Sequence, residues 1–305
     1  MIVPVRDNPD GIAVLLAHLG AQTLPRESFE VLIADDGSVP PAVASSAADG
    51  WATIDWGPRL NSYAARNRVT AAARGEVLAF TDSDCRPEPT WLEQGLAALE
   101  TADLVAGEVT FDPPPAPSIW SLLTVDMFLD QERAVRLSRA VTANLFVRRS
   151  LFDELGGFDE TLPSGGDYDF VLRAVDRRAR LAYAADTVVH HPTLDAARPF
   201  LRKVYETNRC DAFRRARAGG RPALTGFLLV VPPVAVAYAR RQALRPMARL
   251  HHARLRAAGM PAGWREDLRA LPLLYFPIAI WAGLARVRGW TEGLRLQHRE
   301  TASLP

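Results

Sequence analysis

Short β-branched runs alternate with amphipathic stretches along the first part of the chain. The apolar runs 1–5, 29–37 and 76–84 predict three strands, and the stretches 11–22 and 61–75 between them predict two helices. This alternation is typical of βαβ units, which build a parallel sheet. Each predicted strand ends in polar or acidic residues, at the sheet edge where ligands bind in such folds. The pattern therefore predicts an α/β fold, with a Rossmann-like, mostly parallel sheet flanked by helices.

The pattern is less regular after the proline-rich segment 112–118, which we expect to carry the chain over the surface. An amphipathic stretch at 120–137 predicts one helix, and residues 165–179 predict another. The β-branched run 181–192 predicts a further strand that ends in two histidines. Strand, turn and helix thus continue to about residue 200.

Charge divides the chain at about the same point. Residues 1–200 hold 17 Arg and 29 Asp or Glu, a net charge of −12, whereas residues 201–305 hold 19 Lys or Arg and 6 Asp or Glu, a net charge of +13, and the two add up to the overall +1. Such asymmetry indicates an anionic partner for the basic end. Since that end lacks interleaved aromatic residues, we expect an anionic membrane surface as its partner and no nucleic acid. We predict an α/β domain over 1–200 and a basic, helical C-terminal region over 201–305.

Two apolar segments, 223–239 and 270–285, interrupt the basic region. They are 17 and 16 residues long and each contains proline, whereas a straight membrane-spanning helix needs about 20 apolar residues. The arginine-rich loop between them would lie outside the cell if the first segment crossed the membrane, against the usual rule. We therefore favour peripheral or re-entrant helices on the cytoplasmic side of the cell membrane. Core helices and integral, spanning helices remain the alternatives.

Cysteine usage and the start of the chain agree with a cytoplasmic location. Cys85 and Cys210 match no disulfide framework and no zinc-binding spacing. The chain enters an apolar strand-like run at Ile2, without a basic segment or a cleavage site before it.

Paired acids follow two of the predicted strands. Asp35 and Asp36 end the second strand, where one of them has a common role in capping the following turn. Asp82 and Asp84 end the third strand at a spacing that directs both side chains to the same side. Neighbouring carboxylates raise each other's pKa unless a cation lies between them. The second pair therefore predicts a site for Mg²⁺ or Mn²⁺, which in turn binds diphosphate groups.

Five stretches together resemble a known enzyme family. In chain order they are VPVRDN, VLIADDGS, AARNRVTAAARGEVLAFTDSDC, GGFDE and GGDYDF. Their order and spacing over residues 2–192 are similar to those of family 2 glycosyltransferases with the GT-A fold. The resemblance implies a nucleotide-diphosphate sugar as donor, a divalent metal as cofactor, and inversion of configuration at the anomeric carbon.

The resemblance also implies roles for single residues. Asp36 would accept a hydrogen bond from the nucleobase while Asp35 braces the turn. Asp84 would bind the metal directly, and either His190 or His191 would complete the metal site. The residues expected on the donor side are Pro4, Val5, Arg6, Asp36, Arg66, Asp82 and Ser83.

The resemblance implies that Asp167 is the catalytic base. An inverting transfer needs a carboxylate that takes the proton of the acceptor hydroxyl as the oxygen attacks. Family members usually carry an acidic residue directly before this base, but here that position is Gly166. The structural alternative for Asp167 is a helix N-cap. Asp169 is expected to pair with the nearby backbone or with Arg173, and the glycines of GGFDE to serve turn geometry.

Two other functions compete with this interpretation. A nucleotidyltransferase shares a similar core, but it usually needs a glycine-rich phosphate loop and a lysine near the first strand, and residues 1–30 have neither. A catalytically inactive, membrane-docked protein that binds nucleotide sugars would not need both Asp84 and Asp167. We therefore expect a metal-dependent inverting glycosyltransferase, whose acceptor is a cell-envelope or lipid-linked glycan precursor.

Overall fold

A computed structural model describes most of the chain, namely residues 1–42, 51–112, 116, 118–220 and 271–302. The chain forms two compact units. We call them the sheet unit, residues 1–112 and 129–192, and the helical unit, residues 113–128 and 193–305. All the candidate site residues belong to the sheet unit.

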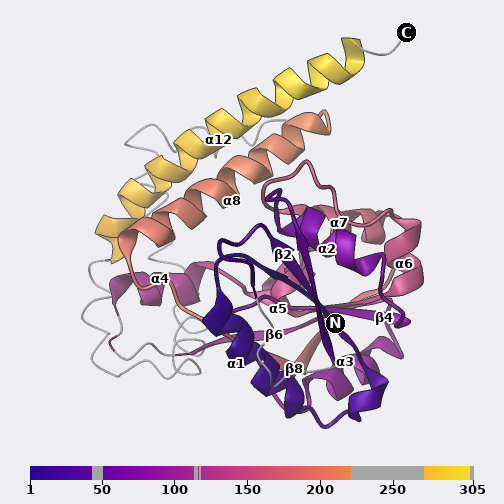
Figure 1. Cartoon of the computed structure of the whole chain (residues 1–305). Helices are drawn as coiled ribbons and strands as arrows, with labels where there is room; N and C mark the ends of the chain where they lie inside the picture. Colours follow the sequence, from indigo (N-terminus) through magenta and orange to yellow (C-terminus); the bar gives the residue numbers. More distant parts are fainter. Residues whose placement is uncertain (43–50, 113–115, 117, 221–270, 303–305) are drawn as a thin grey trace. The chain divides into compact units, whose positions relative to one another are not determined.

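A mixed sheet forms the centre of the sheet unit (Figure 1). It has eight strands in the order β3-β2-β1-β4-β7-β6-β8-β5. Its strands are β1 (Ile2–Val5), β2 (Val31–Asp36), β3 (Ala52–Gly57), β4 (Val77–Phe80), β5 (Arg86–Pro87), β6 (Leu104–Asp112), β7 (Leu145–Arg148) and β8 (Leu181–Pro192). Only β5 and β7 pair antiparallel with their neighbours. The other six strands run in one direction, so their carboxyl ends lie along one edge of the sheet.

Helices cover both faces of this sheet (Figure 1). The helices are α1 (Pro9–Gly20) and α3 (Trp91–Leu99) on one face, and α2 (Ser62–Thr70), α6 (Arg149–Glu154) and α7 (Gly166–Asp176) on the other. Successive strand residues point to opposite faces, so that Val3 and Ile33 pack with the first group while Ile2 and Leu32 pack with the second. The predicted α/β fold, with a largely parallel sheet between helices, is confirmed.

Asparagine side chains start the helices that follow the strand ends. Asn8 caps α1 by accepting a hydrogen bond from the Gly11 amide, and Pro9 occupies the first turn, where its missing N–H costs nothing. Asn61 caps α2 by accepting from the amides of Tyr63 and Ala64. These caps hold the beginnings of both helices.

The single helix predicted at 120–137 is wrong, because the structure has two helices there. The first, α4 (Ile119–Met127), ends at Phe128, whose backbone is extended. Leu129 has a left-handed backbone with φ of +54°, and Asp130 then caps α5 (Gln131–Val135). An amphipathic pattern can continue through such a break, because the order of apolar and polar residues does not show the backbone conformation of a single residue.

Two long helices dominate the helical unit. Helices α8 (Ala197–Arg217) and α12 (Leu271–Ala302) lie side by side (Figure 1). A Cβ on Gly289 would lie 1.9 Å from the carbonyl oxygen of Arg209, which shows how closely the two backbones approach. Beside this contact Arg209 pairs with Glu292 at 2.8 Å.

The second predicted apolar segment, 270–285, coincides with the start of α12, and the first, 223–239, lies outside the described residues. In the part of α12 whose side chains are described, Ile278 and Ala282 pack against Phe200 and Val204 of α8. None of the helices in the described ranges has both the length and the apolarity that a membrane crossing requires.

Candidate active site

The candidate residues gather at the edge of the sheet where the parallel strands end. Arg6 follows β1, Asp36 ends β2, and Asp82 to Asp84 follow β4. His191 lies near the end of β8, and the short 3-10 helix η3 (Thr142–Asn144) precedes the antiparallel strand β7, which places it at the same edge. The topology thus brings together segments from the beginning and the end of the sheet unit's sequence.

Asp35 braces the turn after β2, as predicted. It is fully buried, and its two carboxylate oxygens accept hydrogen bonds from the amides of Ser38 at 2.8 Å and Ala42 at 2.7 Å. Burial alone raises the pKa of this carboxyl, but hydrogen bonds from Ala42, Ser38 and Gly37 outweigh it and hold the pKa below its usual value. Asp35 is therefore an ionised structural acid.

Asp36 points to the other side of the strand. Its Oδ1 accepts a hydrogen bond from the Leu60 amide at 2.7 Å, and its Oδ2 lies 3.5 Å from a guanidinium nitrogen of Arg6. Asp36 is buried, whereas the Arg6 side chain is 39% exposed. The adjacent acids thus have separate partners, and in this way the chain accommodates two neighbouring carboxylates.

Pro4 and Val5 are buried within β1, and Val5 belongs to the apolar core. Both residues are thus buried within the sheet unit, on opposite faces of the strand. Ser83 accepts a hydrogen bond from the Asn8 side chain at 3.2 Å and so ties the loop after β4 to the start of α1.

A buried arginine holds Asp82. The Arg66 guanidinium, on α2, donates to Asp82 Oδ1 at 2.5 Å. Arg66 is only 2% exposed, while the Asp82 side chain is 33% exposed. The Arg66 Nε has no hydrogen-bond partner among the described residues. Arg66 therefore places one carboxylate at the open edge and keeps positive charge directly behind it.

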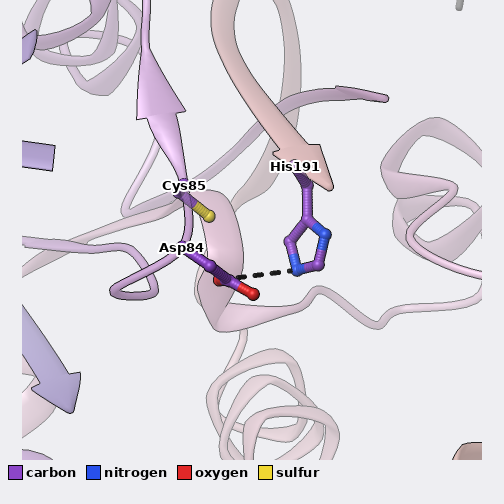
Figure 2. A group of neighbouring side chains, drawn as sticks. All are labelled: Asp84, Cys85 and His191. Carbon is purple, nitrogen blue, oxygen red and sulfur yellow. Dashed lines mark ion pairs between the residues drawn. The ribbon is translucent and has the colours of Figure 1, made fainter. Parts of the chain in front are cut away.

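Asp84 and His191 turn toward each other from different segments (Figure 2). Asp84 Oδ1 lies 3.8 Å from His191 Nε2, too far for a hydrogen bond. The other ring nitrogen, Nδ1, lies 2.7 Å from the Pro192 carbonyl oxygen, which can only accept. This contact requires a proton on Nδ1, so in the neutral ring the Nε2 lone pair is directed toward Asp84.

Cys85 lies next to this pair, and its sulfur completes a group of three potential ligand atoms within 4.8 Å of one another. Its thiol, however, is fully buried and lies 3.9 Å from the Ala143 carbonyl oxygen. Burial, and next the charges of Asp82 and Asp84, raise the pKa of this thiol well above its usual value. Cys85 is therefore a protonated packing residue, and Asp84 and His191 remain as the candidate ligands.

His190 takes a different direction, since neighbouring strand residues face opposite sides. Its Nε2 lies 2.6 Å from a Glu88 carboxylate oxygen, and its Nδ1 lies 3.0 Å from the Thr110 hydroxyl and 3.3 Å from Asp112. Both ring nitrogens thus have partners away from Asp84. Of the two histidines, the structure brings His191 to the candidate metal ligands.

Asp167 lies in the first turn of α7, where Gly165 is the N-cap residue with φ of +75°. Its Oδ1 accepts hydrogen bonds from the Tyr63 hydroxyl at 3.3 Å and from the Tyr168 amide at 2.9 Å. Its Oδ2 lies 3.4 Å from the Thr142 amide. The positive end of the helix favours the ionised carboxylate, as a proton acceptor requires.

The short helix η3 connects Asp167 with the loop after β4. The Thr142 amide donates to Asp167, and the carbonyl of the next residue, Ala143, accepts from the Thr81 hydroxyl at 3.0 Å and lies near the Cys85 thiol. Neither Thr142 nor Tyr63 was singled out from the sequence. The sequence signal that could have indicated Tyr63 is Gly166, whose lack of a side chain leaves room for the Tyr63 ring.

Two structural predictions near Asp167 are confirmed. Asp169 pairs with Arg173 at 2.8 Å, one helical turn away. Gly156 and Gly157 of the GGFDE stretch both have positive φ, and a Cβ on Gly157 would lie 2.7 Å from Asn67 Oδ1. These glycines serve the turn, as expected.

Comparison with proteins of known sequence gives consistent matches. The model of the family described as glycosyl transferase family 2 matches residues 1–156, half of the chain. Glycosyltransferase AglE of Haloferax volcanii is 34% identical over 210 residues, which cover 66% of this chain and 67% of that protein. A pre-mycofactocin glycosyltransferase of Mycobacterium tuberculosis is 30% identical over 209 residues, 63% of this chain but only 42% of that protein.

Solved structures share the fold at low sequence identity. The mannosyltransferase PcManGT from Pyrobaculum calidifontis, in complex with GDP-Man and Mn²⁺, has a TM-score of 0.57 and 20% identity and covers 93% of this chain and 86% of its own. S. aureus TarS in complex with UDP-GlcNAc has a TM-score of 0.52 and 17% identity, with 98% and 91% covered. The resemblance seen in the motifs is thereby confirmed, and the chain belongs to glycosyl transferase family 2.

Proposed function

We propose that this glycosyltransferase transfers a sugar, with inversion and with a divalent metal, from a nucleotide-diphosphate sugar to an acceptor hydroxyl. One observation carries the proposal: a carboxylate–imidazole pair, Asp84 and His191, and a second carboxylate, Asp167, lie at the same sheet edge. Helix η3 contacts both Asp167 and the loop that holds Asp84. One group for the leaving diphosphate and another for the attacking hydroxyl are what an inverting transfer requires.

The proton acceptor in this proposal is Asp167. As the acceptor oxygen bonds to the anomeric carbon, its proton passes to the Asp167 carboxylate, and the bond from that carbon to the diphosphate oxygen breaks with its electron pair. The backbone amides and the Tyr63 hydroxyl around Asp167 all donate, so they favour the charged form that accepts the proton. Attack from the face opposite the diphosphate inverts the sugar carbon.

The residues at the sheet edge fit a divalent ion. Asp84 Oδ1 and His191 Nε2 are 3.8 Å apart, and metal–ligand bonds of about 2.1 Å can reach one ion from both atoms. An oxygen and a neutral imidazole nitrogen suit Mn²⁺, and Mg²⁺ is the alternative where oxygen ligands dominate. When bound, the ion supplies positive charge that stabilises the departing diphosphate.

The donor side of the proposal includes Arg6, Asp36, Arg66, Asp82 and Ser83, with the backbone of Pro4 and Val5. The buried charge of Arg66 stands behind Asp82, and the Asp36 carboxylate next to Arg6 offers an acceptor for a nucleobase N–H. The neighbours described above were solved with GDP-Man and with UDP-GlcNAc, which supports a nucleotide-sugar donor without selecting the base.

We further propose that the acceptor is a cell-envelope or lipid-linked glycan precursor, used at the cytoplasmic side of the membrane. Similar proteins include the succinoglycan biosynthesis protein ExoU of Rhizobium meliloti, 28% identical over 244 residues. Helix α8 ends with Arg214, Arg215 and Arg217, and α12 exposes apolar side chains, Trp281 among them. Flotation with anionic vesicles tests this part, since binding that persists at high salt, or none at all, contradicts a charge-dependent contact.

A thermal-shift screen tests the enzyme proposal directly. UDP-, GDP- and dTDP-sugars are compared with and without Mn²⁺, because a ligand raises the melting temperature according to its occupancy. We expect one nucleotide class to stabilise the protein, more strongly with Mn²⁺ and much less in Asp84→Ala. Asp167→Asn should keep this donor response and lose transfer. A nucleotidyltransferase would instead use the nucleoside triphosphate, and an inactive binding protein would show no turnover in either form.

A further inference from the structure

Tyr63 and Gly166 share one space beside the proposed base. Gly166 begins α7 directly before Asp167. A Cβ at position 166 would lie 2.9 Å from two ring carbons of Tyr63, closer than real Cβ atoms approach their neighbours. The Tyr63 ring thus stands where a side chain at position 166 would begin. The acidic residue that family members usually carry at this point cannot coexist with this ring.

The Tyr63 phenol contacts Asp167, the residue directly after Gly166. The Tyr63 hydroxyl donates to Asp167 Oδ1 at 3.3 Å. This is longer than a typical O–H···O bond of about 2.7 Å, which sets the expected effect at a moderate size. Contacts of this kind are often long in the absence of substrate.

Tyr63 is held in this position from several sides. Its residue is 6% exposed, and its ring packs against Phe158 with 5.6 Å between ring centroids. Its amide donates to the Asn61 side chain, which also donates to the Glu160 carbonyl. The hydroxyl therefore cannot swing away from Asp167 without disturbing the start of α2.

We propose that Tyr63 is a positioning residue for the base. Its phenol takes the place of the acidic residue that family members usually carry at the position of Gly166. The inference rests on the proposed role of Asp167. A neighbouring carboxylate repels the charge of the base, whereas a phenol donor stabilises that charge and orients the oxygen that carries it. This chain therefore keeps its base ionised by a hydrogen bond in place of an acid pair.

The charged groups around this contact have other partners. They are Arg66, which faces the Tyr63 ring and pairs with Asp82, the Asp169–Arg173 pair on α7, and Arg139 against the Tyr168 ring. Burial, and next the charge of Asp167, raise the pKa of the Tyr63 phenol well above its usual value, and Arg66 lowers it in part. Tyr63 thus remains a proton donor over the working pH range.

Tyr63→Phe tests the inference, because it removes the hydroxyl and keeps the ring. The first readout is the pH profile of kcat/KM for nucleoside diphosphate release from the donor sugar identified by thermal shift. We expect the acid limb to move up by about half to one pH unit, and kcat to fall by about three- to tenfold with little change in donor KM. The second readout is the ¹³C NMR titration of labelled aspartate carboxyls, which needs no substrate and should give the same upward shift for Asp167.

Two comparisons make the result decisive. Tyr183→Phe is the matched control, since its hydroxyl donates to Glu108 at 2.6 Å in the same unit, and it should leave both readouts unchanged. An unshifted Asp167 titration in Tyr63→Phe overturns the role of Tyr63, even if Asp167→Asn abolishes transfer. Full transfer by Asp167→Asn would instead overturn the proposed base itself.

A double variant covers the case in which Tyr63→Phe does not fold. Tyr63→Ala with Gly166→Glu opens the space and restores an acidic neighbour to the base. We expect its acid limb to lie about one pH unit or more above that of the wild type, because the carboxylates now repel. An acid limb at the wild-type position would contradict the inference.

Discussion

Asn67 pairs with Phe158 through both of its amide atoms. Its Oδ1 accepts from the Phe158 amide at 3.0 Å, and its Nδ2 donates to the Phe158 carbonyl at 2.9 Å. One side chain thus satisfies both backbone groups of a buried residue, as a neighbouring strand would. This contact anchors the turn 156–160 to α2, the helix that also carries Tyr63 and Arg66.

Asn67→Ala should therefore destabilise the sheet unit. It leaves the two backbone groups of Phe158 without their partner, for which we expect a loss of about 2 kcal/mol in the free energy of unfolding. Urea denaturation measures the change. Asn208→Ala serves as the control, because within the described part of the chain that side chain has one hydrogen bond, to the Val204 carbonyl of its own helix. Equal effects of the two substitutions would contradict this role of Asn67.

Asp35→Asn should cost about 1–3 kcal/mol at neutral pH, because an amide nitrogen would face one of the two backbone donors that now bind the carboxylate. The pKa of Asp35 is lowered in the folded state, so its stabilising contribution is present above the unfolded pKa of about 3.9 and is lost as the pH falls toward the folded value. The stability gap between wild type and variant should thus narrow below about pH 4. Denaturation curves from pH 7 to pH 3 check this, and a constant gap would contradict it.

The two adjacent histidines should respond differently to substitution. His191→Ala removes a candidate ligand and should abolish most of the additional thermal stabilisation that Mn²⁺ gives to the donor complex, with metal affinity reduced by at least tenfold. His190→Ala should keep the Mn²⁺ response while lowering the melting temperature, since it breaks contacts with Glu88 and Thr110. The reverse pattern would assign the metal to His190.

Gly289→Ala should disrupt the pairing of α8 and α12. The new Cβ would meet the Arg209 carbonyl at 1.9 Å, so the helices must separate there and lose the packing around the contact. We expect a loss of more than 2 kcal/mol in unfolding experiments. Gly20→Ala is the matched control, because nothing lies within 4 Å of a Cβ at that helix end, and it should be neutral or slightly stabilising.

The sequence was most informative about β1, β2 and β4, whose residues are almost all buried. The bounds of these strands, and those of the less buried β8, agree closely with the predicted apolar runs. β3 is not predicted because it lies at the edge of the sheet, where exposed polar residues such as Asp55 interrupt the apolar pattern. β7 was missed because it passes into α6 at Arg149 without any turn residue between them. β6 is not predicted either, although most of it is buried, so the local pattern does not detect every interior strand.

The site could be predicted only as a set of residue types. Motif order led to Asp84 and Asp167, but it left His190 and His191 equivalent, since the choice depends on which face of β8 each one occupies. That face is determined by the pairing of β8 with β6 and β5, which no local sequence encodes. The sequence places Tyr63 in a predicted helix, but it does not show that this residue contacts Gly166, because the two positions are far apart in the chain.

The Asp84–His191 pair also has a consequence for biosynthesis. Between these residues the chain leaves the sheet unit at Pro113 and returns at Leu129, and β8 is the last strand to be made among the residues that the structure describes. A nascent chain that has emerged only as far as β7 has the carboxylate but not the imidazole. Any ion that needs both must therefore be captured late in synthesis, and a fragment that stops before β8 would lack that ability.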